Sequence, residues 1–307
     1  MADELRRDID DFYSYLANEK RASPFTLKSY HQVLEKVYEV LTKNFPELTS
    51  FTQLEKQHMR LLSREFNFSE DMEELKSSTI AHSVYALSSF FKFMILRGRI
   101  DKNPVDLIKA PRVKKSLPQV LTLNEVLSIL DMIHPQNNYQ VRDLCMVELM
   151  FSSGLRVGEL VSLNIGSIDF GQRELRVMGK GSKERVVPIG SQALYSLHNY
   201  LHLRGEFKPV DDALFVNKYG KRITTRAVEQ NLNKLAQLAD LGGKVTPHKF
   251  RHAFATELLA HGADLRTVQE LLGHASLAAT QIYTHVNLEQ MRRTYNKAHP
   301  RAIRREA

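Results

Sequence analysis

The stretch from Thr246 to Tyr283 constrains the fold more than any other, because it places helix starts and helix stops at short intervals. It reads TPHKFRHAFATELLAHGADLRTVQELLGHASLAATQIY. The opening threonine followed by Pro247 is typical of a helix N-terminus, and Gly262 of a helix end. Asp264 then caps a second helix, which runs to Gly273. The stretch therefore predicts short helices joined by tight turns.

Four chemically active side chains lie on or directly after these helices. His248 and Arg251 are three residues apart, so they share one face of the first helix. His274 follows the glycine that ends the second helix, and Tyr283 lies one short helix later. A phosphodiester attacked by a phenol passes through a phosphorane with extra negative charge. Arginine matches that charge, histidine can exchange the phenol proton, and tyrosine is then the covalent nucleophile.

Two upstream motifs add further candidates. In FSSGLRVGEL, Gly154 stops one helix and Arg156 opens the next, with Glu159 one turn further on. The segment RELRVMGKGSKERVVPI is typical of a β-hairpin, with Lys180 at its tip. A lysine in a hairpin turn is usually a solvated surface charge, but the glycines on both sides allow a backbone to approach DNA closely.

These residues together resemble a known family. The Arg-Lys-His-x-x-Arg-His-Tyr constellation of the tyrosine recombinases (phage integrase family) is matched in order by Arg156, Lys180, His248, Arg251, His274 and Tyr283. The run LLGHASLAATQIYTH is similar to the Xer subgroup, and the end, YNKAHPRAIR, is most similar to its XerC branch. The resemblance is close from about Pro111 onward and covers the first hundred residues in general layout.

The resemblance implies a covalent mechanism. Tyr283 attacks the scissile phosphate, which gives a 3′-phosphotyrosyl link and frees a 5′-hydroxyl. Arg156 and Arg251 hold the non-bridging oxygens and stabilise the phosphorane, and His274 adds a donor to the same oxygens. Because the link conserves the phosphodiester energy, no ATP is expected, and we expect no metal or other cofactor.

The resemblance also implies two catalytic roles in proton transfer and one supporting role. His248 is the expected base toward the phenol, and Lys180 is the expected general acid for the leaving 5′-oxygen. Glu159, one helical turn past Arg156, is expected to orient the active-site groups.

Charge and length favour two domains and a polyanionic partner. The chain has 307 residues, a net charge of +8 and a pI near 9.4. Residues 1–115 carry 19 Lys and Arg against 17 Asp and Glu, whereas residues 116–307 carry 24 against 18. The excess positive charge therefore lies mostly with the catalytic motif.

The predicted fold class is mainly α. Residues 1–102 are expected to form a helical, core-DNA-binding bundle from apolar patterns over 3–20, 23–41, 51–64 and 80–98. The proline-containing segment 103–118 is expected to be an extended linker. Residues 119–307 are expected to form an α+β catalytic domain with a small antiparallel hairpin or sheet, a short strand at DALFVN and a helix from Thr224 or Thr225. The resemblance implies that the two domains form a C-shaped clamp around duplex DNA.

Basic and hydroxyl side chains outside the catalytic motif are candidate DNA contacts, since such groups bind phosphates well. A solvated helix face is the competing interpretation. The candidates are Lys28, Lys76, Thr79, Lys92, Arg112, Lys114, Lys115, Lys183, Lys221, Arg222 and Arg226.

Cysteine use and hydropathy bear on the compartment. The single cysteine, Cys145, lies in an apolar helix and is expected to be a buried structural residue in a reducing compartment. No run of eighteen uninterrupted apolar residues occurs, and MADELRRDIDDF does not resemble a signal peptide. We expect a soluble, cytoplasmic protein without membrane insertion.

Three other functions remain open at this point. A type IB topoisomerase uses the same chemistry with one protomer, and a binding-only protein would use the same clamp without the covalent step. A metal hydrolase could use His248, His252, His261 and His285, but no carboxylate completes that site.

The resemblance also implies partners. Xer proteins act in pairs at a chromosome dimer resolution site, which implies a second, XerD-like recombinase in a heterotetramer and regulation by a septal, FtsK-like DNA translocase. In the last twenty residues, Leu288, Met291 and Tyr295 form a short apolar stripe at helical spacing. The resemblance implies that this tail docks into a neighbouring protomer, and packing on its own domain is the alternative.

Overall fold

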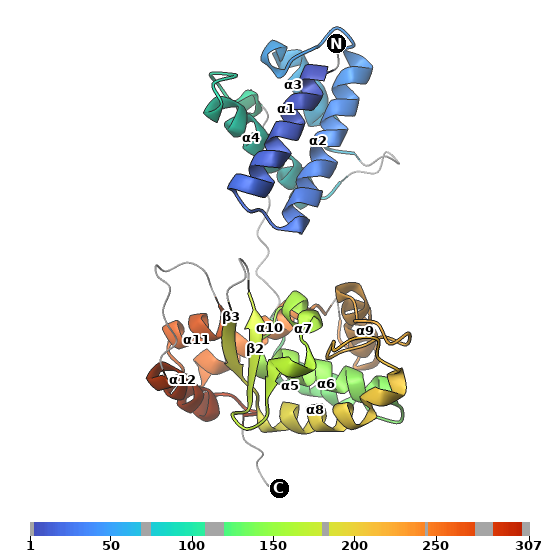
Figure 1. Ribbon diagram of the computed structural model, residues 1–307, viewed down its shortest axis with the longest axis vertical. Helices are drawn as coiled ribbons and strands as arrows, with labels where there is room; N and C mark the ends of the chain where they lie inside the picture. Colours follow the sequence, from blue (N-terminus) through green and yellow to red (C-terminus); the bar gives the residue numbers. More distant parts are fainter. Residues whose placement is uncertain are drawn as a thin grey trace. The chain divides into compact units, whose positions relative to one another are not determined.

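The computed structural model describes residues 3–68, 75–107, 120–179, 184–242, 245–273 and 285–302. The chain divides into two compact units, Met1–Leu117 and Pro118–Ala307. Each unit has its own hydrophobic core, and each is described here by itself. Figure 1 shows helices in both units and strands in the second.

The first unit is a helical bundle. Its core is closed by aromatic contacts, in which Phe12 meets the edge of Phe90 at 5.5 Å between ring centres and Phe51 meets Phe90 at 4.8 Å. Two short 3-10 turns, Phe51–Gln53 and Pro104–Leu107, lie beside the helices. The helices are α1 (Asp3–Ser14), continued by a π turn (Tyr15–Glu19), α2 (Pro24–Asn44), α3 (Lys56–Glu65) and α4 (Ser77–Leu96). The predicted helix over 51–64 is thus a 3-10 turn and a separate helix, because Ser50 and Glu55 each cap a new start.

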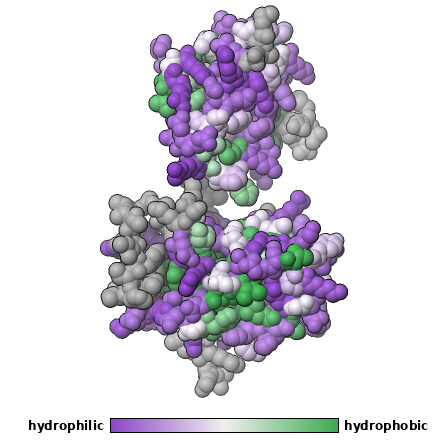
Figure 2. Space-filling view, in the orientation of Figure 1, coloured by the Kyte–Doolittle hydropathy of each residue, from purple (hydrophilic) through white to green (hydrophobic). Residues whose placement is uncertain are grey.

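Helix α4 is the described helix that is long and apolar enough to cross a membrane by length and composition. Half of its most apolar window is buried inside the bundle. Its inward side chains, including Leu87, Phe90 and Phe91, have no exposed surface. These buried side chains give that side of α4 the environment of a core helix. The face of this unit in Figure 2 is mostly hydrophilic.

The second unit is helical with one small sheet. Its helices are α5 (Leu123–Asp131), α6 (Asn138–Ser153), α7 (Val157–Ser162), α8 (Ser191–Leu203), α9 (Thr225–Leu238), α10 (Pro247–Ala260), α11 (Leu265–Leu272) and α12 (His285–Ala298). The strands β1 (Ile168–Asp169), β2 (Glu174–Met178) and β3 (Glu184–Pro188) pair antiparallel in that order. Short 3-10 turns occupy Ile165–Ser167 and Arg204–Phe207. The predicted fold class, mainly α with a small antiparallel sheet, is confirmed.

Local signals in the sequence account for most of these boundaries. Thr122 and Glu125, three residues apart in the sequence, form a capping box, with Glu125 N–H donating to the Thr122 hydroxyl at 3.3 Å. Asp264 caps α11 by accepting from the Thr267 N–H at 2.9 Å. Gly154 and Gly273 end α6 and α11 with positive φ angles of 59° and 64°, a conformation that glycine adopts without strain.

One prediction about strands needs correction. DALFVN is not a strand, because Ala213 and Val216 make only isolated bridges, to Asn164 and Arg222. The short strand β1 adds a third member to the predicted hairpin, with Ile168 opposite Leu175. A two-residue strand has too little alternation to be recognised from sequence. Cys145 is buried as predicted, and burial raises the pKa of its thiol.

Candidate active site

The site is organised around one buried carboxylate. Glu159 lies on α7 and is 5% exposed. Its oxygens accept from the backbone N–H and from Nη1 of Arg156, both at 2.8 Å, so the pair closes the first turn of α7 as a capping box. Burial alone would raise the pKa of Glu159, but hydrogen bonds and positive charge from Arg185 and Arg156 hold it below its ordinary value. Glu159 is therefore a fixed negative charge at neutral pH.

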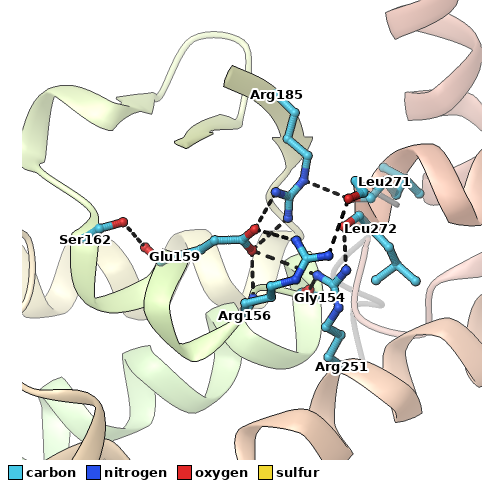
Figure 3. A network of polar contacts seen from close by, with 9 residues as sticks. Gly154, Arg156, Glu159, Ser162, Arg185, Arg251, Leu271 and Leu272 are labelled. Atoms are coloured by element: carbon cyan, nitrogen blue, oxygen red, sulfur yellow. Dashed lines mark hydrogen bonds and ion pairs between the residues drawn. The ribbon is translucent and has the colours of Figure 1, made fainter. Parts of the chain in front are cut away.

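Three arginines surround this carboxylate (Figure 3). Arg185 on β3 makes two bonds to it, at 2.6 and 2.8 Å, and Arg251 on α10 lies 3.9 Å away. The three guanidinium groups come from different elements, so the carboxylate joins α7, β3 and α10. One negative charge among three positive ones leaves a positive site, which suits a phosphate.

The same arginines also bond the end of α11. Arg185 Nε donates to the Leu271 carbonyl at 3.2 Å, Arg251 Nη2 to the Leu272 carbonyl, and Arg156 Nη2 to the Gly273 carbonyl at 3.4 Å. The last carbonyls of a helix have no partner within the helix and carry partial negative charge. The arginines therefore cap α11 at the residue before His274.

Arg251 is held from two sides. Its Nη1 donates to the carbonyl of Gly154 at 2.7 Å, where α6 ends. A side chain at Gly154 would collide with the Phe254 ring 2.5 Å away, so only glycine allows α6 and α10 this approach. Burial first, and then the nearby charge of Arg156, lower the pKa of Arg251 to about 10. The group stays positively charged at neutral pH, and Arg156, with a 44% exposed side chain, is the more accessible of the two.

His248 lies one turn before Arg251 on α10 and is exposed. Its ring centre is 6.2 Å from that of His252. Thr246 precedes the helix at the predicted cap position, although its side chain makes no capping bond. The i, i+3 spacing predicted for His248 and Arg251 is thus present on a regular helix. Lys180, His274 and Tyr283 lie outside the described residues.

The alternative metal site finds no support among the residues with described positions. Within that part of the chain no three His, Cys, Asp or Glu side chains cluster as metal ligands would. His261 instead bonds the Glu257 carbonyl through Nδ1 at 2.8 Å. The side chain of His285 is not among those described.

The candidate DNA contacts differ in their surroundings. Lys28 on α2, with Lys76, Thr79 and Lys92 at or on α4, is exposed, as are Lys221 and Arg226. Arg222 differs, because it donates to the carbonyls of Val161 and Leu163 and to the Asn164 side chain. Its guanidinium therefore already holds the loop after α7. The remaining candidates, Arg112, Lys114, Lys115 and Lys183, lie outside the described residues.

Sequence reasoning missed Arg185, the strongest partner of Glu159. The signal was present, because Arg185 and Val187 on β3 alternate with Ile189 directly after it, and all three are buried. A charged residue at an inward strand position is rare unless it is paired. Arg185 is not one of the six residues of the tyrosine recombinase constellation, so the motif does not point to it.

The comparisons with known proteins decide the family. Residues 119–290 match the model of the phage integrase family, and residues 9–98 match the phage integrase N-terminal SAM-like domain. The chain belongs to the phage integrase family. The predicted family is confirmed, and the chain is a tyrosine site-specific recombinase.

Relatives extend this similarity over nearly the whole recombinase. The tyrosine recombinase XerC of Mannheimia succiniciproducens is 38% identical over 298 residues, covering 97% of this chain and 99% of the relative. That of Shewanella amazonensis is 39% identical, covering 96% of each chain. The predicted similarity to the XerC branch is confirmed.

Solved structures share the fold at lower identity. A XerH recombinase bound to its difH substrate superposes with a TM-score of 0.66 at 21% identity, covering 91% of this chain and 78% of that one. A lambda integrase dimer bound to a COC′ core site gives 0.65 at 19% identity, covering 91% and 99%. Both agree with a recombinase fold for this chain.

Proposed function

We propose that this recombinase cuts and rejoins duplex DNA through a 3′-phosphotyrosyl intermediate on Tyr283. The convergence of Arg156 and Arg251 on one carboxylate and one helix end carries the proposal. A guanidinium has five N–H donors, and the bonds described above use only part of them. The remaining donors can bind the non-bridging oxygens of a scissile phosphate beside His274.

The proposed chemistry is one in-line exchange. The Tyr283 oxygen forms a bond to phosphorus as the bond from phosphorus to the 5′-oxygen breaks. His248 accepts the phenol proton, and Lys180 gives a proton to the departing 5′-oxygen. Arg156, Arg251 and His274 stabilise the added negative charge of the phosphorane. The reverse reaction rejoins the strand, so neither ATP nor a metal ion is required.

The biological setting follows from the similarity to XerC proteins. We propose action in the cytoplasm at a dif-like site, with a XerD-like partner in a heterotetramer, to resolve chromosome dimers during cell division. Regulation by an FtsK-like septal DNA translocase belongs to the same proposal. The two units are proposed to clamp the duplex, with the first bundle and the 103–118 linker contacting the DNA backbone.

The first test traps the covalent link. A nicked duplex carrying a dif-like site is incubated with protein in EDTA, and a denaturing gel reports the adduct. Tyr283→Phe should abolish the adduct while DNA binding persists, because only one hydroxyl is removed. Tyr295→Phe is the matched control. Tyr295 is 1% exposed and bonded to Ser152, and burial raises its pKa well above the ordinary value.

Other outcomes would contradict the proposed nucleophile or the proposed class of enzyme. An adduct that persists in Tyr283→Phe would remove Tyr283 as the nucleophile, and a requirement for added metal would place the enzyme in another mechanistic class. Strand exchange between two sites separates a recombinase from a type IB topoisomerase. Binding without any adduct in the wild type would favour a binding-only protein.

A further inference from the structure

Arg185 is a buried charge beside the proposed catalytic arginines, and the proposed mechanism leaves it without a role. It lies on β3 and is 5% exposed, so almost none of its side chain is accessible to a DNA strand. Each of its three guanidinium nitrogens makes a bond inside the protein, two of them to Glu159 and one to the Leu271 carbonyl. A buried charge costs free energy unless it is paired, so the role of this arginine is to be sought in the groups that it bonds.

The main partner of Arg185 is the Glu159 carboxylate, whose negative charge requires a counter-ion. The carboxylate orders Arg156 through two bonds, one to its backbone and one to its side chain. If Arg156 were its main counter-ion, the carboxylate would cancel the positive charge that Arg156 must present to a phosphate. Arg185 binds both oxygens of Glu159 and supplies the neutralising charge. Arg156 is then oriented by Glu159 without being neutralised by it.

Arg185 also fixes the end of α11. Its Nε bonds the Leu271 carbonyl, and its side chain packs against Gly273, where an added Cβ would lie 2.9 Å from Arg185 Cδ. The next two carbonyls of the helix accept from Arg251 and Arg156. A shift of Arg185 would therefore move the acceptors that hold both of these arginines.

We propose that Arg185 is a positioning residue for the recombination reaction, which neutralises Glu159 and fixes the last turn of α11 so that Arg156 and Arg251 keep their charge and donors for the scissile phosphate. The inference rests on the proposed function. It also explains the residue type, because a lysine at this position has one compact ammonium group. Arg185 reaches the two carboxylate oxygens and the Leu271 carbonyl with three separate nitrogens, whereas lysine would have to reach all three acceptors from one nitrogen.

The test compares two buried arginines. Arg185→Lys and Arg204→Lys each replace a buried guanidinium that donates to backbone carbonyls, but Arg204 bonds Asp211, Ala213 and Leu214 and not Glu159. The rate of adduct formation is measured on the nicked duplex at saturating protein. Arg185→Lys should slow it about a hundredfold, as expected for reacting groups displaced by about an ångström. The protein concentration for half-saturation should stay unchanged, and Arg204→Lys should keep the wild-type rate.

A second substrate separates positioning of charge from a general structural defect. Replacing one non-bridging oxygen of the scissile phosphate by a methyl group removes one negative charge, so arginine stabilisation contributes less to the barrier. The defect of Arg185→Lys should shrink on this methylphosphonate, as should that of Arg156→Lys. The double variant should be slowed by less than the product of the two single effects, because both act through one carboxylate. Equal defects on both substrates, or independent effects, would overturn the inference.

Gly273→Ala provides a route that keeps every charge. The added methyl group presses on the Arg185 stem at a position with positive φ, so it should reproduce the slower rate and the methylphosphonate pattern. If Arg185→Lys does not fold, Gly273→Ala still shows whether a displaced Arg185 slows adduct formation. Wild-type protein that forms no adduct would instead refute the proposed function. Wild-type adduct with normal rates in both Arg185→Lys and Gly273→Ala would refute this inference alone.

Discussion

At the scale of single residues, His299 shows how packing selects a protonation state. Its Nε2 bonds the Phe151 carbonyl at 3.2 Å, and its Nδ1 accepts from the Arg301 N–H at 3.2 Å. One nitrogen donates and the other accepts, which the neutral imidazole alone can do. Burial first, with the positive charges of Arg301 and His261, lowers the pKa of His299 to about 3.

This buried histidine predicts a pH dependence of stability. The unfolded chain takes up the proton near the ordinary pKa of 6.5, whereas the folded chain resists it until about 3. The contribution is therefore present above pH 6.5 and is lost as the pH falls toward 3. Between pH 7 and 4 the loss should be on the order of 3 kcal/mol.

Denaturant melts of His299→Gln across this range measure the effect. The variant should be less stable than the wild type at pH 7 but should lose less stability on acidification. His134→Gln is the control and should leave the slope unchanged, because His134 is exposed and is not one of the groups that shift the pKa of His299. Parallel pH profiles for wild type and His299→Gln would refute the explanation.

At the scale of elements, helix α12 is anchored to its own domain. Met291 and Tyr295 are 3% and 1% exposed in a cluster with side chains of α10 and α11. The Tyr295 hydroxyl is hydrogen-bonded to the Ser152 hydroxyl at 2.8 Å. Arg301 Nε donates to Glu148 Oε2 at 2.9 Å. Of the two interpretations left by the sequence, packing of the tail on its own domain is seen for Met291 and Tyr295, the members of the stripe whose side chains are described. Docking of the tail into another protomer stays a prediction.

This arrangement determines where the tail can be shortened to test docking into another protomer. Removing everything after Asn287 would take away Met291, Tyr295 and Ala298, which close an apolar core. The shortened chain would then lose stability as well as any exchange, so a loss of cooperative DNA binding would not report on exchange. Removal of residues 303–307 spares the buried cluster and gives the cleaner measurement of cooperativity on a full site.

Gly190→Ala tests the anchoring of this segment. A methyl group there would meet the Arg301 carbonyl at 2.4 Å and the Tyr295 hydroxyl at 2.7 Å. We expect a loss of about 1–3 kcal/mol, the usual cost of overpacking, with faster proteolysis of residues 291–302. Gly205→Ala is the control, since nothing lies within 4 Å of the position of its added Cβ. An unaltered melt and protease pattern in Gly190→Ala would show that the segment is not held in this way.

The sequence predicted those elements whose signals are local. The capping box of Thr122 and the stop at Gly154 depend on a few neighbouring residues, so their boundaries were recoverable. The partners of Arg185 are 26 and 86 residues away along the chain. Such pairing depends on how β3, α7 and α11 meet, which no periodic pattern encodes. The catalytic motif could name Arg156 and Arg251 but could not show that one carboxylate serves both.

At the scale of the molecule, the two units have separate cores. Apolar clusters of the first unit lie within residues 5–105, and those of the second within residues 121–302. A unit with its own core can fold alone. The network of Glu159 and the three arginines belongs entirely to the second unit. The proposed chemistry is therefore separable from the proposed contribution of the first unit to DNA binding.

The isolated second unit, residues 118–307, provides the last prediction. It should fold, because its clusters are complete, and it should form the adduct at high protein concentration. Its affinity for the nicked duplex should fall by about two orders of magnitude or more, since two linked binding modules act at a high effective concentration. A gel-shift titration at several salt concentrations measures this. The dependence on salt should also weaken, because the exposed Lys28, Lys76 and Lys92 are absent.

A charge variant of the full chain separates lost contacts from lost folding. Lys28→Gln with Lys76→Gln and Lys92→Gln should lower affinity and the salt slope while the melt stays unchanged, because all three side chains are exposed. Lys43→Gln with Lys56→Gln and Lys102→Gln is the matched control, since these three exposed lysines lie outside the candidate set. Equal affinity of the isolated second unit and the full chain would mean that the first bundle does not hold DNA, and the proposed clamp would then be wrong.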